Sequence, residues 1–115
     1  MKWTLAILLL SVTTLAANPR QWSDVIIGKG FRNPSTYFIV CKGFPREGLE
    51  NEIQRRGTAR EAALINAQFF AREIFDDSVD VVRNGNAEKT EYFPGYAVVH
   101  YVIEQPGLSD RLRYY

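Results

Sequence analysis

The sequence predicts an α+β domain in which one long helix packs on a small antiparallel sheet. A helix start signal at Thr58–Glu61 is followed by apolar residues at helical spacing up to about Phe75. A β-branched and aromatic run at Thr36–Lys42 precedes this helix, and the alternating segment Tyr96–Ile103 follows it. Because turn residues rather than further helices separate the later strands, we expect a β-meander and therefore an antiparallel sheet.

The first seventeen residues have the three-part layout of a secretory signal peptide. Lys2 supplies a positive charge, Leu5–Leu10 form an apolar run, and cleavage is expected after Ala16 or Ala17. An uncleaved anchor is the alternative, but the segment is shorter than the roughly 20 apolar residues that a bilayer crossing requires. We therefore expect an exported protein, periplasmic or secreted and in some cases associated with the outer membrane, with no integral membrane span after cleavage.

Three parts follow from this division of the chain: a signal peptide (1–17), an N-terminal segment (18–35) and a single α+β domain (36–115). The N-terminal segment is rich in turn formers, with a possible short strand at Val25–Ile27. Without Lys2, the chain has equal numbers of basic and acidic side chains. A net charge near zero argues against a nucleic-acid binder.

The strand expected at Thr36–Lys42 is apolar on both faces, which is typical of a central strand. Cys41, the only cysteine in the chain, lies within it, so we expect a buried and inert thiol; a disulfide between two chains is the alternative. Gly43–Gly48 should end the strand. The polar residues 49–57 are expected to form a loop or one short helical turn.

The helix is expected to start at Thr58, because Thr58 and Glu61 have the spacing of a capping box. Its sheet-facing stripe is predicted to consist of Ala63, Ala67, Phe70 and Ile74. Its polar face is predicted to carry Glu61, Gln68 and Arg72.

Beyond the helix, we expect a short strand at Ser78–Arg83 and a second, near an edge of the sheet, at Ala87–Phe93. The pair Asn84-Gly85 between them is a strong turn signal, and Pro94-Gly95 turns the chain again. Residues Leu108–Tyr115 are expected to form a tail or a final helical turn.

No residue pattern indicates catalysis. His100 is the only histidine, which excludes metal sites built on two histidines, and no nucleophile motif lies near it. Asp76, Asp77 and Asp80 cluster after the helix, but their spacing matches no calcium loop, so we interpret them as a solvated connector. We therefore predict a protein that is not an enzyme and needs no cofactor or metal.

An anion site is the one candidate binding site that the residues themselves suggest. Arg55 and Arg56 precede Thr58, at the expected helix N-terminus. Unpaired N–H groups there, together with two guanidinium groups, could bind a phosphate or carboxylate. The alternative is that both arginines are solvated loop charges paired with nearby glutamates.

The segment Gly57–Gln68, preceded by the strand Phe38–Phe44, resembles the core of the LPP20-type envelope lipoproteins. Tyr96–Ile103 matches the closing strand of that family, so the resemblance covers about residues 36–104. It implies a small helix-on-sheet domain in the bacterial envelope, without general catalytic residues. The chain lacks the family's lipid-acceptor cysteine after the signal peptide, which favours a soluble periplasmic or exported protein.

Two functions follow as hypotheses. The first is a non-catalytic interaction or accessory module of the cell envelope, which contacts an envelope protein or a second copy of itself. Its candidate contact residues are Ile65 and Phe69, which either form an exposed patch or pack under the N-terminal segment.

The alternative is a small anionic-ligand-binding protein that uses Arg55, Arg56 and Thr58. A cystatin-like inhibitor would have a similar shape, but the Gln-x-Val-x-Gly loop of that family is absent.

Overall fold

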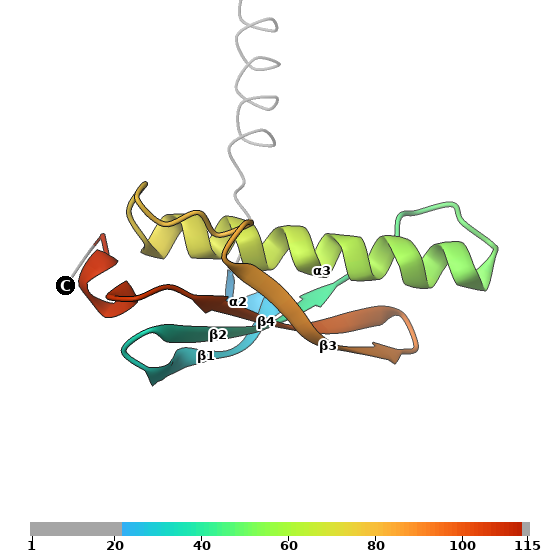
Figure 1. The fold of residues 1–115 in the computed structure, drawn as a ribbon. Helices are drawn as coiled ribbons and strands as arrows, with labels where there is room; N and C mark the ends of the chain where they lie inside the picture. The colour runs from blue at the N-terminus through green and yellow to red at the C-terminus, as the bar shows by residue number, and fades with distance from the viewer. Residues whose placement is uncertain (1–21, 114–115) are drawn as a thin grey trace, which may run out of the picture.

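The computed structural model describes residues 22–113, so the predicted signal peptide (1–17) lies outside the described residues. Helix α3 (Glu52–Ile74) is 23 residues long and packs on a four-stranded antiparallel sheet (Figure 1). The predicted α+β fold, with one long helix on a small antiparallel sheet, is confirmed.

The sheet consists of two hairpins placed side by side. Its strands run in the order β1-β2-β4-β3, and each neighbouring pair is antiparallel. Helix α3 covers one face of this sheet, and the other face carries no second layer among the described residues (Figure 1). The strands are β1 (Ile26–Asn33), β2 (Thr36–Gly43), β3 (Gly85–Phe93) and β4 (Tyr96–Glu104). The short elements are α2 (Trp22–Val25) and the 3-10 helix η1 (Leu108–Arg111).

Strand β1 lies within residues 18–35, which were predicted to form a separate N-terminal segment. The boundary expected at residue 36 therefore cuts through the β1–β2 hairpin. The glycines that suggested turns lie inside the strand, where they leave room for the ring of Phe38. A Cβ atom at Gly30 would lie 3.3 Å from that ring. Edge strands tolerate glycine for this kind of close approach.

The predicted start of the helix at Thr58 is wrong, because α3 begins at Glu52. Asn51 is its N-cap, and the Asn51 side-chain oxygen accepts hydrogen bonds from the backbone N–H groups of Ile53 (2.9 Å) and Gln54 (3.2 Å). An asparagine in this position satisfies backbone donors that the first helical turn leaves unpaired. Residues 52–57 are therefore helical rather than a loop.

Thr58 lies more than one turn inside α3 and does not cap it. Its hydroxyl donates to the backbone oxygen of Arg55 (3.2 Å) and accepts from the backbone N–H of Arg46 (3.0 Å). The side chain thus fastens the loop after β2 to the helix.

Small residues let α3 approach the sheet closely. Ala63 and Ala67 are fully buried, as predicted, and Phe70 is buried beside them. On the facing strand, a Cβ atom at Gly43 would lie only 2.1 Å from the backbone nitrogen of Ala63. The side-chain nitrogen of Asn66 donates to the backbone oxygen of Lys42 (3.1 Å), which ties the two elements together.

The strand expected at Ser78–Arg83 is absent, because these residues form turns before β3 begins at Gly85. Val81 is nevertheless buried, and its backbone oxygen accepts a hydrogen bond from the hydroxyl of Tyr101 (2.5 Å). Gln68, expected on the polar face of α3, donates to the same hydroxyl at 3.4 Å.

The end of the chain returns to the end of α3. Leu108, in η1, is fully buried, which agrees with the predicted final helical turn. Phe75 and Leu112 pair as an isolated β-bridge, and the Arg113 side chain donates from Nε to the backbone oxygen of Arg72 (3.1 Å). This donor satisfies a carbonyl that the last helical turn would otherwise leave unpaired. Within residues 22–113, no helix combines the length and apolarity that crossing a bilayer needs.

Candidate functional site

A groove of about 380 Å³ lies between the first turns of α3 and the turn that joins β3 to β4. The groove is lined by Glu52, Arg55, Arg56, Tyr92, Phe93, Pro94 and Gly95. Charged side chains come from the helix and aromatic side chains from the hairpin.

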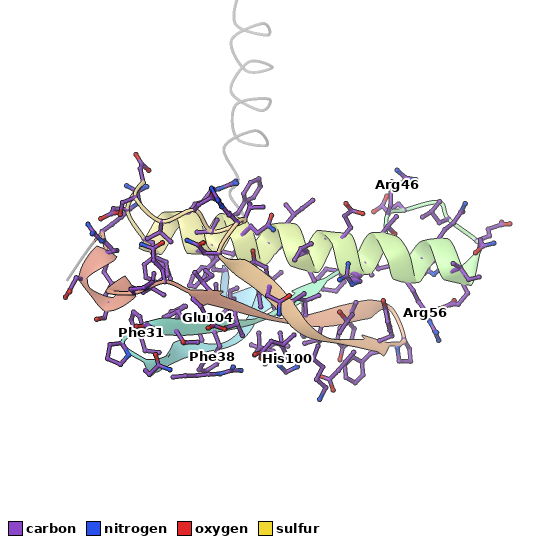
Figure 2. All side chains as sticks on the ribbon, in the orientation of Figure 1. Phe31, Phe38, Arg46, Arg56, His100 and Glu104 are labelled. Carbon is purple, nitrogen blue, oxygen red and sulfur yellow. The ribbon has the colours of Figure 1, made fainter. Side chains whose placement is uncertain are left out.

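The helical wall of the groove carries two guanidinium groups. Arg55 is half-buried, and its Nη1 donates to the backbone oxygen of Leu49 (3.3 Å). Arg56 is exposed, and its Nε lies 3.4 Å from an oxygen of Glu52. Figure 2 shows Arg56 on the sheet side of the first turns of α3. Because a guanidinium has five N–H donors in a planar fork, each arginine keeps donors for a ligand.

The β3–β4 hairpin carries aromatic rings and cations on both of its faces. Phe93 stacks on Tyr96, with ring centroids 5.1 Å apart and an interplanar angle of 20°. The ammonium group of Lys42 lies 5.0 Å from the centroid of the Tyr96 ring. The guanidinium of Arg56 lies 5.6 Å from the centroid of Tyr92. Tyr92 and Phe93 remain 44% and 42% exposed, respectively. They are adjacent in β3, so their side chains point to opposite faces of the sheet: Tyr92, paired with Ala97, faces α3, and Phe93, paired with Tyr96, faces away from it.

The structure brings two of the three predicted anion-binding residues to this groove. Arg55 and Arg56 line it, but Thr58 is not among the described lining residues, and its hydroxyl bonds within the protein. The physical premise of that prediction was wrong, because the unpaired N–H groups of the helix start lie near Asn51 and not at Thr58. What accompanies the arginines is instead the ring of Tyr92, 5.6 Å from the Arg56 guanidinium.

Sequence reasoning missed the aromatic half of the site. Tyr92 lies far from the arginines in the chain, and only the fold brings its ring to Arg56. The signal that could have found it is the concentration of aromatic residues around Pro94-Gly95, since large rings beside an exposed turn have little core to bury in.

The candidate contact residues Ile65 and Phe69 lie on the outer side of α3, with 42% and 43% of their surface exposed. The guanidinium of Arg72 lies 5.9 Å from the centroid of the Phe69 ring. Ile65 and Phe69 were expected either to form an exposed patch or to pack under the N-terminal segment (18–35). Among the described residues, both side chains are exposed. Of that segment, residues 22–35 are described and form α2, β1 and the turn after it.

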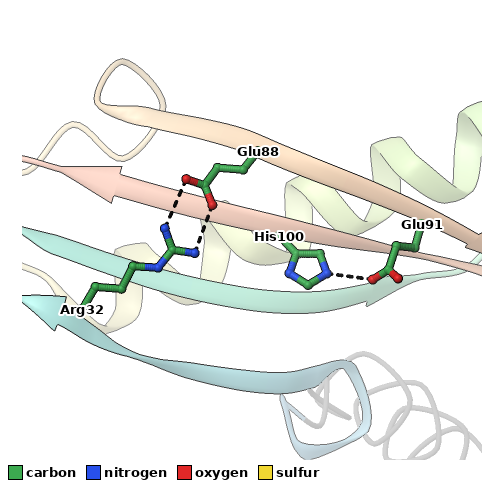
Figure 3. Close-up of polar contacts among 4 residues, drawn as sticks. All are labelled: Arg32, Glu88, Glu91 and His100. Atoms are coloured by element: carbon green, nitrogen blue, oxygen red, sulfur yellow. Dashed lines mark hydrogen bonds and ion pairs between the residues drawn. The ribbon is translucent and has the colours of Figure 1, made fainter.

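Two ion pairs lie on the sheet face opposite α3 (Figure 3). Arg32 on β1 makes two hydrogen bonds to Glu88 on β3, at 3.0 and 3.1 Å, and so connects the two edge strands. His100 on β4 lies 2.8 Å from Glu91 on β3. These hydrogen bonds lower the pKa of both carboxyl groups. His100 therefore has a partner on the neighbouring strand, as expected of a structural histidine on a sheet face.

The aspartates after α3 support turns and a contact with the end of the chain. Asp76 accepts hydrogen bonds from the backbone and the hydroxyl of Ser78, which lower its pKa. Asp80 accepts from two backbone N–H groups, and Asp77 pairs with Arg113 at 2.6 Å. Within residues 22–113, no group of three or more histidine, cysteine or acidic side chains is arranged to hold a metal ion.

Comparison of the chain with protein-family models, with curated proteins and with solved structures gives no match.

Proposed function

We propose that the protein is a non-catalytic binding module of the bacterial cell envelope, and that the groove at the start of α3 is its ligand site. One observation carries this proposal: Arg55 and Arg56 line a groove of about 380 Å³ together with Tyr92, whose ring lies 5.6 Å from the Arg56 guanidinium. The envelope location rests on the signal-peptide layout and on the resemblance to the LPP20-type lipoproteins.

The arginines define the charge of the ligand. Arginine suits planar, charge-assisted recognition of carboxylate and phosphate groups. Nη1 of Arg55 donates to the backbone oxygen of Leu49, and Arg56 lies between Glu52 and the Tyr92 ring, so both guanidinium groups are placed at the groove. The ligand is therefore a small molecule, or an exposed part of a larger one, that carries a carboxylate or phosphate.

The test is a titration of the protein with glucuronate, glucose 6-phosphate and inorganic phosphate, followed by backbone amide chemical shifts. We expect at least one of these anions to shift amides of residues 52–56 and 92–95. The double variant Arg55→Gln/Arg56→Gln should weaken this binding by about tenfold or more, because it removes both charge-assisted contacts.

A matched control removes two exposed arginines outside the groove, in the double variant Arg60→Gln/Arg83→Gln. This control changes the net charge equally and should bind like the wild-type protein. The proposal fails if none of the three anions binds, or if both double variants lose binding to the same extent, since the effect would then reflect net charge alone.

A second candidate function is a protein contact through the outer side of α3. The exposure of Ile65 and Phe69, four residues apart on one helix face, favours it. A photo-crosslinker at position 65 should capture either a second copy or one envelope protein in intact cells, and Phe69→Asp should abolish the capture. The same crosslinker at position 83, an exposed residue outside α3, is the control; equal capture from both positions would contradict a specific contact.

A further inference from the structure

We infer that a second copy of this chain packs on the sheet face opposite α3, so that the two sheets meet in a symmetric dimer. This surface is separate from the groove and from the outer side of α3. Three features support the inference: an apolar strip on the central strands, an exposed aromatic group at one end of the strip, and charges of opposite sign on the two halves of the face.

The two central strands are apolar on both faces. On β2, Phe38 and Val40 alternate with the buried side chains that face α3, so they point away from the helix (Figure 2). On β4, Val102 pairs with Phe38 and Val98 pairs with Lys42, which places both valines on the same outer face. The outer strip consists of Phe38, Val40, Val98 and Val102. A solvated face of an antiparallel sheet normally carries polar side chains, whereas strands that are apolar on both faces are typical of a sheet covered on both sides.

An aromatic group continues the outer strip toward the β3–β4 turn. Phe93 stacks on Tyr96 at 5.1 Å, and the Phe44 ring lies 6.3 Å from the same ring. Phe44 and Phe93 are 52% and 42% exposed, while Phe38 and Val40 in the strip are half-buried. Exposed aromatic rings that extend an apolar surface mark a contact with another protein.

Basic and acidic side chains lie on opposite halves of this face. Strands β1 and β2 contain no acidic residue, and their cations on the outer face are Arg32 and Lys42. The carboxylates on the outer face of the described strands all belong to the β3–β4 hairpin: Glu88, Glu91 and Glu104. One hairpin is therefore basic on this face, and the other is predominantly acidic.

Arg32 and Glu88 are the charges best placed to reach a partner. Lys89 and His100 already contact Glu91, at 3.7 and 2.8 Å. Arg32 bonds to Glu88 across both central strands, yet the two side chains stay 46% and 40% exposed (Figure 3). Each of them can therefore turn from this contact within one copy to the same contact between two copies.

The division of charge favours a second copy of the chain over an unrelated protein. A two-fold axis that runs parallel to the strands, between two facing sheets, places the basic hairpin of each copy over the acidic hairpin of the other. Arg32 of one copy then lies over Glu88 of the second copy, and the reverse contact forms as well. A symmetric dimer requires this kind of self-complementary surface. Facing sheets pack nearly aligned, at a separation of about 10 Å.

The face is large enough for such a dimer. It is built from four strands of eight or nine residues. With strands about 4.8 Å apart and a rise of about 3.3 Å per residue, its area is roughly 500 Å². Two copies bury roughly 1,000 Å² together, the size at which specific interfaces begin. The dimer thus needs the whole face, including the aromatic group, because a smaller overlap would fall below that size.

The first experiment measures the oligomeric state by sedimentation equilibrium between about 1 and 100 μM, a range that covers micromolar dissociation constants. We expect the wild-type protein to form a dimer. Val40→Lys should make it monomeric, because the substitution places an unpaired charge in the middle of the outer strip. Ile65→Lys adds the same charge on the exposed outer side of α3 and should leave the dimer intact. A wild-type monomer throughout this range, or a dimer disrupted by Ile65→Lys alone, would overturn the inference.

The second experiment does not depend on how well Val40→Lys folds. Arg32→Glu and Glu88→Arg each place like charges together, so each variant alone should dimerise at least about tenfold more weakly than wild type. In an equimolar mixture, the contacts within each copy remain between like charges, but the contacts between the two variants join opposite charges. Native mass spectrometry should therefore show a mixed dimer in preference to either homodimer. A mixture without this preference would show that the pair acts only within one copy, and the two-fold packing would be wrong.

Discussion

At the scale of single residues, Gly43 sets the distance between α3 and the sheet. A Cβ atom there would lie 2.1 Å from the backbone nitrogen of Ala63 and 2.2 Å from the backbone oxygen of Ala59. Backbone atoms of a packed helix cannot move aside as a flexible side chain could. We expect Gly43→Ala to lower the free energy of unfolding by about 1–3 kcal/mol, the usual cost of overpacking, as measured by urea denaturation.

Gly57 provides the matched control for this prediction. It lies inside α3, is exposed, and a Cβ atom there would meet nothing within 4 Å. Gly57→Ala should therefore raise the free energy of unfolding by about 0.5–1 kcal/mol, because alanine loses less backbone entropy in a helix. Equal destabilisation by both substitutions would contradict the close approach at Gly43.

The Arg32–Glu88 pair gives the second residue-level prediction, a dependence on pH. The hydrogen bonds from Arg32 lower the pKa of Glu88 from its ordinary value of 4.5. A carboxyl group with a lowered pKa in the folded state stabilises the protein above its ordinary pKa, and this contribution is lost as the pH falls through the lowered value. We expect Glu88→Gln to be less stable than wild type near neutral pH, with a difference that shrinks on acidification.

Urea denaturation of both proteins between neutral pH and about pH 3 measures this effect, and Glu61→Gln, on the outer face of α3, is the control. The difference should be small and should fall with added salt, because both partners of the pair are exposed. A difference that stays constant across the acid range would contradict the ion-pair explanation.

At the scale of elements, the start of α3 shows where sequence patterns are informative and where they are not. The buried stripe of Ala63, Ala67 and Phe70 could be predicted, because apolar side chains at helical spacing must face a core. The first six residues of the helix could not, because they contact little of the sheet and carry no apolar periodicity. Thr58 and Glu61 then gave a local start signal that the longer helix overrides.

The cap at Asn51 leads to a prediction that distinguishes a helix start at Glu52 from the expected start at Thr58. Asn51→Ala should lower the free energy of unfolding by about 1 kcal/mol, because two backbone N–H groups lose their acceptor. Asn51→Asp keeps an acceptor and adds a charge that the helix N-terminus favours, so it should retain wild-type stability. If Asn51→Ala had no effect, the helix would not depend on this cap.

The segment before β3 shows a different reason for a missed element. Val79 and Val81 alternate with polar residues, which is the pattern of a strand, and both are buried as that pattern suggests. They are buried through turns held by Asp80 and by the hydroxyl of Tyr101. Alternation therefore identified the buried residues correctly but not the backbone conformation. Such side-chain bonds to the backbone compete with a strand ladder, and sequence spacing does not reveal them.

At the scale of the whole molecule, the two hairpins depend on each other and on α3. The central strands β2 and β4 pair along their full length, so opening the sheet at its middle would separate the molecule into two halves. Helix α3 crosses this seam on one face, and the Arg32–Glu88 pair crosses it on the other. The candidate groove needs the same arrangement, because α3 and the β3–β4 hairpin supply its two walls. We therefore expect the fold and the proposed binding site to unfold as one cooperative unit, a relation that no local sequence pattern indicates.

Cys41 allows this cooperativity to be measured. It lies on β2 under α3, and its side chain is fully buried. A thiol reagent should therefore label it only when α3 and the sheet separate. We expect the labelling free energy, obtained from the rate in excess reagent, to equal the free energy of unfolding measured with urea. Gly43→Ala should accelerate labelling by the factor that its loss of stability predicts. Fast labelling of the stable wild-type protein, or a disulfide-linked dimer under oxidising conditions, would show that the helix opens locally and that the seam is not a single cooperative unit.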